Sequence, residues 1–469
     1  MNRPVHWRTR AAAAAAAVLS LGVLAACSSS STSSSSSSAP AATSSAPAAT
    51  SAAPATSSSP TSTAVSTSSC GSKPGVVATG TPINLGTINT DQPGTSFTDI
   101  ANMAQAYFTC VNDNGGINGH PIKYFIKTEQ TNPTQIAADA SDLVSSDHVV
   151  GIVGNTSIIE CTIDHSTWEK LGFYIIDSGI APECWSTPNS AAVNMGPRYS
   201  SDGAVQYALD TVHASKIVFD QSNVPGTTYI AAGPNALAKA AGVPITDMTT
   251  NVPISDGNSV AISLVNAAGK NGSVILNFTP PDALVILEAA QKLNIEDNVK
   301  SWGCSTPCDT DFLAKALGPK WDNRLFVNAE LTPADGINTT TMNLYKAILA
   351  QYGKAVTGGI GSFSQFGFVE ARLAVQALDT ITGPYTVASV NAAFKALSNV
   401  DTGMLCQTWT YGSYSMHIPN NEDYTVTPTG NGLMELVPGS GCLQISTVDP
   451  QIAQYVALAG RAPADPTAT

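Results

Sequence analysis

Residues 112–122 read Asn112-Asp113-Asn114-Gly115-Gly116-Ile117-Asn118-Gly119-His120-Pro121-Ile122. Two adjacent glycines and an asparagine-rich run favour left-handed and turn conformations, so a preceding helix should end here. That helix is predicted over residues 97–111, where apolar residues recur at helical spacing behind Ser96 as a cap. Strands are predicted on either side of this pair, at residues 83–88 and 123–126. The stretch therefore lies inside a strand–helix–strand unit, the building block of a parallel sheet.

The same alternation of short apolar runs and longer amphipathic runs continues along the chain. Strands are predicted at residues 149–153, 173–177, 216–220 and 274–278, and helices at residues 157–171, 202–212, 228–241, 259–270 and 283–293. Helices predominate over residues 342–397. About 370 residues after the N-terminal region exceed what a single core holds. The sequence therefore predicts an α/β protein with two lobes, each a doubly wound parallel sheet covered by helices on both faces.

The N-terminal region has the pattern of an export signal. Arg3, Arg8 and Arg10 precede an apolar run at residues 11–24, which ends in Leu24-Ala25-Ala26-Cys27. This ending resembles the bacterial lipoprotein box, which implies a signal peptide at residues 1–26 and acylation of Cys27. A signal cut elsewhere, leaving Cys27 as an ordinary thiol, is the alternative. Up to Cys70 the chain is built from Ser, Thr, Ala, Pro and Val, a composition that predicts a disordered linker over residues 27–70.

Charge and cysteine content narrow the functional classes further. A formal net charge of −13 excludes the basic surface that nucleic-acid binding needs. Apart from Cys27, eight cysteines remain in a chain with an export signal, which favours disulfides over metal sites or a free thiol nucleophile. Eight cysteines allow 105 connectivities, and we predict the sequential one. Its pairs are Cys70–Cys110, Cys161–Cys184, Cys304–Cys308 and Cys406–Cys442.

Candidate ligand-binding residues follow from the predicted topology. In open parallel sheets, ligands bind beyond the carboxyl ends of the strands, where loops lead into helix N-termini. The loops at those ends are rich in glycine, hydroxyl and amide groups, and supply the candidates Asn155, Thr156, Ser157, Ser178, Gly179, Ala181, Gln221 and Asn277. Asp177 could bind a ligand or cap the next turn. Trp302 and Phe366 could line the cleft or belong to the core. For residues 154–157, the alternative to ligand binding is that they only cap the following helix.

A family resemblance rests on the stretch quoted first. It resembles the N-x-x-GG-I-x-G-x-x-I signature of type I periplasmic binding proteins, in the branched-chain amino-acid binding subgroup. Residues 150–157, residues 177–183 and the small residues of 365–378 support it, and the resemblance spans residues 81–448. It implies two lobes joined by three crossing segments with a ligand cleft between the lobes. The crossings are then expected near residues 197–201, 327–332 and 402–409.

The resemblance also implies lobe boundaries and second-lobe contacts. The first lobe is expected at residues 81–200 and 330–405, the second at 201–329 and 406–448, and a frayed tail at 449–469. First-lobe hydroxyls and amides grip the ligand in the amino-acid binders of this family, while the second lobe supplies an aromatic and an acidic residue. Those two places fall on Val224 and Asp256 here. Val224 is not aromatic, and Asp256 is the only carboxylate at the acidic place. Both departures from the family pattern argue against an α-amino acid and leave a small polar or carboxylated solute.

Three functions remain open, and none of them is catalytic. The sequence has no GxSxG, HExxH or GxxxxGK[ST] motif, and no GxGxxG motif that follows a strand. We expect no cofactor and no metal. The first hypothesis is a monomeric solute-binding lipoprotein on the outer face of the cytoplasmic membrane, which delivers its solute to ABC permease subunits. The alternatives are a ligand-sensing lipoprotein coupled to a membrane kinase and an envelope scaffold that binds no small molecule.

Overall fold

The computed structural model describes residues 70–412, 416–417, 419 and 421–458, all of which belong to one compact unit. The predicted signal peptide, Cys27 and the linker up to residue 69 lie outside the described residues. Within the described part, no helix combines the length and the apolar character that crossing a bilayer requires.

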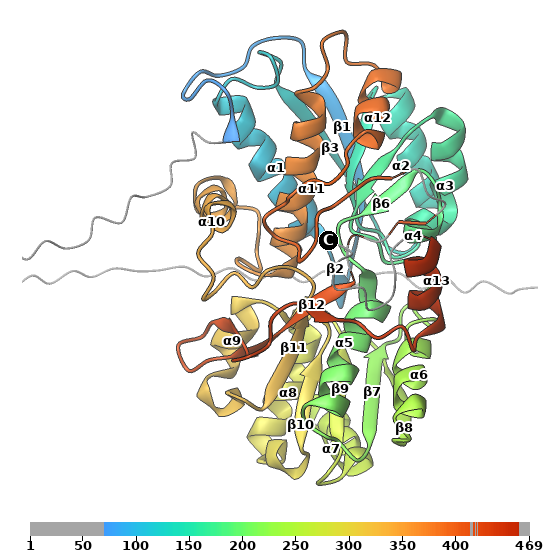
Figure 1. Ribbon diagram of the computed structural model, residues 1–469, viewed down its shortest axis with the longest axis vertical. Helices are drawn as coiled ribbons and strands as arrows, with labels where there is room; N and C mark the ends of the chain where they lie inside the picture. Colours follow the sequence, from blue (N-terminus) through green and yellow to red (C-terminus); the bar gives the residue numbers. More distant parts are fainter. Residues whose placement is uncertain (1–69, 413–415, 418, 420, 459–469) are drawn as a thin grey trace, which may run out of the picture. The chain divides into compact units, whose positions relative to one another are not determined.

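The first lobe is built on a six-stranded sheet of order β2-β1-β4-β5-β6, with β3 paired to β1 (Figure 1). All of its pairings are parallel except the one between β1 and β2. The strands are β1 (Ile83–Gln92), β2 (Thr95–Ser96), β3 (Ile122–Glu129), β4 (Gly151–Asn155), β5 (Ile175–Asp177) and β6 (Ser190–Ala192). The helices are α1 (Thr98–Asp113), α2 (Pro133–Ser145), α3 (Glu160–Leu171), α4 (Glu183–Ser186), α10 (Thr340–Tyr352), α11 (Ser362–Leu378) and α12 (Val387–Lys395).

The second lobe is built on an eight-stranded sheet of order β13-β12-β11-β10-β9-β7-β8, with β14 paired to β12. Strands β7 to β11 pair in parallel, and β12 to β14 add an antiparallel edge. The strands are β7 (Ile217–Ser222), β8 (Ile245–Thr250), β9 (Ser273–Asn277), β10 (Ser301–Cys304), β11 (Leu325–Ala329), β12 (Glu422–Pro428), β13 (Met434–Leu436) and β14 (Leu443–Gln444). The helices are α5 (Gly196–Asp210), α6 (Ala232–Ala240), α7 (Gly257–Ala268), α8 (Pro280–Leu293) and α9 (Asp311–Leu317), with 3-10 turns η2 (Glu296–Asn298), η3 (Thr306–Cys308) and η4 (Pro319–Trp321). The predicted fold class, two α/β lobes with mostly parallel sheets, is confirmed.

Helices α1 and α11 lie side by side on the first sheet, although more than 250 residues separate their starts (Figure 1). Phe108 of α1 and Phe368 of α11 are fully buried in the same core. The two backbones approach closely at Gly367, where a Cβ would lie 2.0 Å from the carbonyl oxygen of Ile100. A glycine is therefore required at this point of the helix–helix contact.

The structure contains all four predicted disulfides, Cys70–Cys110, Cys161–Cys184, Cys304–Cys308 and Cys406–Cys442. Each disulfide joins two cysteines that follow one another in the order of cysteines along the chain, as the sequential connectivity requires. The first ties the segment before β1 to helix α1, close to the turn that the sequence analysis started from.

The end of the chain differs from the sequence-based expectation in two places. Residues 406–411 were assigned to the second lobe, but Trp409 and Tyr411 are buried in the core of the first lobe. The Trp409 indole N–H donates to the carbonyl of Ala192 at 2.9 Å, so burial of these aromatics keeps the chain in the first lobe until close to β12. Residues 449–469 were expected to be frayed, but residues 450–458 form helix α13 (Pro450–Leu458). Ile452 and Tyr455 of α13 are buried, and the Tyr455 ring stacks on Tyr199.

We expect Gly367→Ala to lower the free energy of unfolding by about 1–3 kcal/mol or more, because the added methyl group forces α1 and α11 apart. Gly383→Ala is the matched control, since a Cβ there meets no atom within 4 Å. Urea unfolding measures both. Equal stability of the two variants would show that α1 and α11 can separate at no cost.

Candidate functional site

The carboxyl ends of the parallel strands in both sheets lead into loops that line an inner chamber of about 80 Å³. The first lobe contributes the loops after β4 and β5 and the starts of α1 and α11, and the second lobe contributes the loops after β7, β9, β10 and β11. The lining is largely apolar: Phe97, Ile100, Ile158, Ile180, Val224, Ile230, Phe278, Phe363 and Phe366. None of the described residues that line it is Lys, Arg or His.

A second, outer chamber of about 540 Å³ lies next to the inner one. The two chambers share four lining residues, Thr95, Thr279, Pro307 and Phe363. The remaining wall comes from the β1–β2 hairpin, residues 253–254, the starts of α8 and α9, and residues 357–364. Here too, no described lining residue carries a positive charge.

The two lobes contact each other directly around these chambers. The Tyr229 hydroxyl in the second lobe donates a hydrogen bond to the carbonyl of Ile180 in the first. Thr279 Oγ1 donates to the Gly94 carbonyl at 3.1 Å, and Ser362 Oγ donates to the Thr306 carbonyl at 3.0 Å. Hydrogen bonds on several sides of the cleft show that the lobes are closed on one another.

The loop after β4 places one candidate residue on the chamber and uses the others to hold the lobe together. Thr156 lines the inner chamber. Asn155 Oδ1 accepts the Ile88 amide at 2.8 Å, and the Ser157 hydroxyl donates to Glu129 Oε1 at 2.8 Å. Asn155 and Ser157 are nearly fully buried and line neither chamber.

The loop after β5 shows the same division. Ser178 lines the inner chamber, but its hydroxyl donates to Glu370 Oε1 of α11. Asp177 is completely buried, accepts the Ser190 hydroxyl at 2.6 Å and lines neither chamber, which favours the structural alternative for this residue. Burial raises the pKa of Asp177 and of Glu370 well above the usual carboxyl range.

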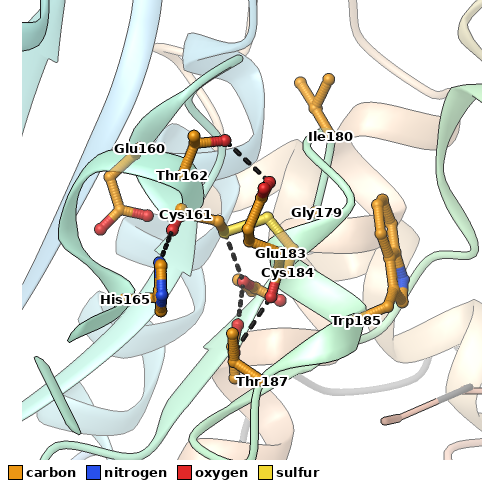
Figure 2. The surroundings of a disulfide bond; sticks show 12 residues. Glu160, Cys161, Thr162, His165, Gly179, Ile180, Glu183, Cys184, Trp185 and Thr187 are labelled. Atoms are coloured by element: carbon orange, nitrogen blue, oxygen red, sulfur yellow. Dashed lines mark hydrogen bonds between the residues drawn. A yellow bond between two sulfur atoms is a disulfide. The ribbon is translucent and has the colours of Figure 1, made fainter. Parts of the chain in front are cut away.

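The Cys161–Cys184 disulfide joins helix α3 to α4, the short helix that follows the loop after β5 (Figure 2). Nearby, Thr162 Oγ1 donates to Glu183 Oε2 at 2.8 Å, which links α3 to α4 a second time. Gly179 is needed for this close approach, because a Cβ there would lie 2.5 Å from Cys184 Cβ. Gly179 and Ala181 therefore shape the loop, and it is Ile180 between them that reaches the inner chamber.

In the second lobe, two of the five candidates reach the inner chamber. Val224 and Asn277 line it, and Asn277 Oδ1 accepts the Ser305 hydroxyl at 2.8 Å. Gln221 is buried at the end of β7 and lines neither chamber.

The other two second-lobe candidates lie away from both chambers. Trp302 is fully buried against Trp321, with its indole N–H donating to the Glu296 carbonyl at 3.1 Å, so the core alternative is the correct one. Asp256 is the exposed N-cap of α7 and accepts the Ser259 amide at 3.0 Å. Its side chain caps the helix and lines neither chamber.

Glu330, which follows β11, is a chamber residue that the sequence analysis missed. It is 2% exposed, lines the inner chamber, and accepts the backbone amide of Met195. Burial raises its pKa to about 7. The sequence analysis predicted no strand at the position of β11, so the rule that ligands lie beyond strand carboxyl ends was not applied there.

Two clusters have the composition of a metal site, Cys161 with Asp177 and Cys184, and Cys406 with Glu422 and Cys442. In both clusters the cysteines are joined in disulfides, and metal binding by cysteine requires a thiolate. Neither cluster therefore has the chemistry of a metal site.

Comparisons with protein-family models and with solved structures both find binding proteins. A family model described as "Periplasmic binding protein" matches residues 82–427. No curated protein matches the sequence. Among solved structures, the chain is similar to a fatty acid ABC transporter substrate-binding protein from Thermomonospora curvata, with a TM-score of 0.67 and 16% identity over 81% of this chain and 95% of that one. It is also similar to a branched-chain amino acid ABC transporter protein from Thermus thermophilus with bound valine, with a TM-score of 0.67 and 13% identity over 80% and 99% of the two chains. At these identities the two likenesses establish the fold.

The raised pKa of Glu330 makes stability depend on pH. Because the folded protein holds this proton more tightly than the unfolded chain, the stabilisation present below pH about 4.5 is lost as the pH rises through about 7. We expect Glu330→Gln to be more stable than the wild type at pH 8 by about 1–3 kcal/mol, and to show little difference at pH 4.5. Urea unfolding at both pH values measures this, with Glu435→Gln, on partly exposed β13, as the control. A wild-type advantage at pH 8 would contradict the assignment.

Proposed function

The chain belongs to the periplasmic binding protein family, and we propose on this basis that it captures a small solute between its lobes and delivers it to an ABC importer. The closed cleft with its inner chamber is the observation that supports this most directly. Solute binding to both lobes would stabilise the closed form, and the importer would recognise that form. The protein's work is then binding and release, without chemical turnover of the solute.

The lining of the inner chamber narrows the solute class. The sequence alone suggested hydroxyl and amide groups around a small polar or carboxylated solute, but Ser178 donates its hydroxyl to a buried carboxylate, and Ser157 does so away from the chamber. Aliphatic and aromatic side chains form most of the chamber wall, and hydroxyl and amide side chains such as Thr156 and Asn277 form the rest. Glu330 supplies an acidic group, and no described lining residue is basic. We therefore propose a solute with an apolar body and one head group that donates hydrogen bonds, such as an amide, an alcohol or an amine.

The fold does not select the solute by itself. The name of the first similar structure mentions a fatty acid, and that of the second mentions bound valine. The solute must therefore be selected by the residues that line the chambers. These residues differ from those of an amino-acid site, because this chain has Val224 at the place of the aromatic residue.

The membrane attachment is a further part of the proposal. The Leu24-Ala25-Ala26-Cys27 sequence supports lipidation of Cys27, and the Ser/Thr/Ala/Pro-rich linker would hold a monomeric binding unit away from the outer face of the cytoplasmic membrane. Labelling of the expressed protein with a radioactive fatty acid, lost in Cys27→Ala, tests this independently of binding.

We expect Val224→Trp to abolish or weaken solute binding at least about tenfold, because the larger side chain fills a chamber of about 80 Å³. The primary screen is a thermal-shift panel of amides, alcohols, amines, amino acids and carboxylates, in which a solute at about one hundred times its Kd adds about 2.7 kcal/mol of stability. Calorimetry then compares the variant with Val77→Trp, which replaces a valine that is 62% exposed and lines neither chamber. A panel that stabilises nothing would favour the scaffold alternative, and equal binding by both variants would exclude the inner chamber as the site.

A further inference from the structure

We propose that the inner and outer chambers form one continuous binding site for an elongated solute. The head group occupies the inner chamber, and an apolar chain runs past Phe363 and Pro307 into the outer chamber. This inference rests on the proposed function and adds to it the length of the solute and the path of its chain.

The size of the inner chamber is the first argument. Its volume is about 80 Å³, about half that of a cavity of about 150 Å³ that is known to hold a molecule as small as benzene. The outer chamber measures about 540 Å³, within the range of roughly 300–1,000 Å³ that is typical of ligand pockets. In the closed form, a solute larger than a few non-hydrogen atoms must therefore extend from the inner chamber into the outer one.

The position of the boundary between the chambers is the second argument. Thr95 and Phe363 of the first lobe and Thr279 and Pro307 of the second lobe line both chambers. The same side chains therefore form the end of one chamber and the beginning of the other. A chain that passes this point contacts both lobes, so it contributes to holding them closed.

The chemistry of the outer wall is the third argument. Phe312 and Val285 are apolar, yet their side chains are 40% and 37% exposed. Both line the outer chamber. Pro253, Ile254, Pro280, Pro281 and Phe363 extend this apolar wall. An apolar chain lying here would remove these side chains from water, at a gain of about 25 cal/mol per Å².

Several polar groups of the outer chamber are engaged by the protein, although Thr95 Oγ1 and Asp282 Oδ2 have no hydrogen-bond partner within the described part of the chain. Asp99 accepts the amides of Thr357 at 2.8 Å and of Gly358 at 2.6 Å. Asp282 accepts the Ile254 amide at 2.8 Å. With two carboxylates and no basic residue among the described lining residues, this chamber disfavours a negatively charged tail. The solute class is therefore a linear, uncharged or cationic amphiphile whose polar group sits at one end.

Two primary amides that differ only in chain length, butanamide and octanamide, test the proposal by calorimetry on the full-length protein. We expect octanamide to bind the wild type about 10- to 200-fold more tightly, the upper value corresponding to full burial of four methylene groups. Phe312→Ala and Ser96→Trp alter the outer chamber only, by removing apolar wall and by obstructing it. Both should reduce the octanamide affinity about tenfold and leave the butanamide affinity unchanged.

Leu293→Ala is the matched control, because Leu293 is 38% exposed and lines neither chamber. Equal affinity of the wild type for the two amides overturns the continuous site while leaving the proposed function intact. A chain-length preference that survives both outer-chamber variants also overturns it. If the wild type binds neither amide, the proposed solute class fails, and the extended site fails with it.

Discussion

Parallel strands place all of their carboxyl ends on one edge of a sheet, and in this protein the loops from two such edges line a common cleft. This constraint explains why residues far apart in the sequence meet at the inner chamber. The loops after β4 and β5 reach it from one lobe, and the loops after β7, β9, β10 and β11 reach it from the other. Helix α11, which lies between β11 and β12 of the second lobe in chain order, returns to the first sheet and brings Phe363 and Phe366 to the same place.

Buried carboxyl groups beneath the first-lobe loops determine where the loop hydroxyls point. Glu129 accepts hydrogen bonds from Thr90 and Ser157, and Glu370 accepts one from Ser178. A buried carboxyl without such donors would be costly, so these hydroxyls are held inside the lobe. These bonds engage the hydroxyls within the lobe, and Phe97, Ile158 and Ile180 form much of the apolar surface that a solute meets on this side.

The charge distribution agrees with the apolar character of the cleft. Glu330 contributes an acidic group to the inner chamber, next to the start of α5, and its amide partner Met195 lies where the chain leaves the first lobe. The protonation state of Glu330 therefore affects the charge that the head group of a solute meets. It also affects the hydrogen bond from Met195, at the connection between the lobes. An uncharged head group would be compatible with Glu330 in either protonation state, whereas an anionic one would be repelled by the ionised form.

The sequence by itself determined the alternation of strands and helices and the two-lobed α/β fold class, because these depend on local periodicity. The sequential cysteine pairing was one of 105 possible connectivities, and the structure established it. The sequence also located the loops that line the cleft, since their position follows from parallel topology. Only the tertiary structure decided which side chain of each loop faces the solute. The direction of Ser157, the burial of Trp302 and the meeting of Phe97 with Phe363 depend on contacts between residues distant in sequence, such as Ser157 with Glu129 and α1 with α11. Those contacts leave no local pattern, because the energy that selects them arises only when distant elements of the same lobe pack together.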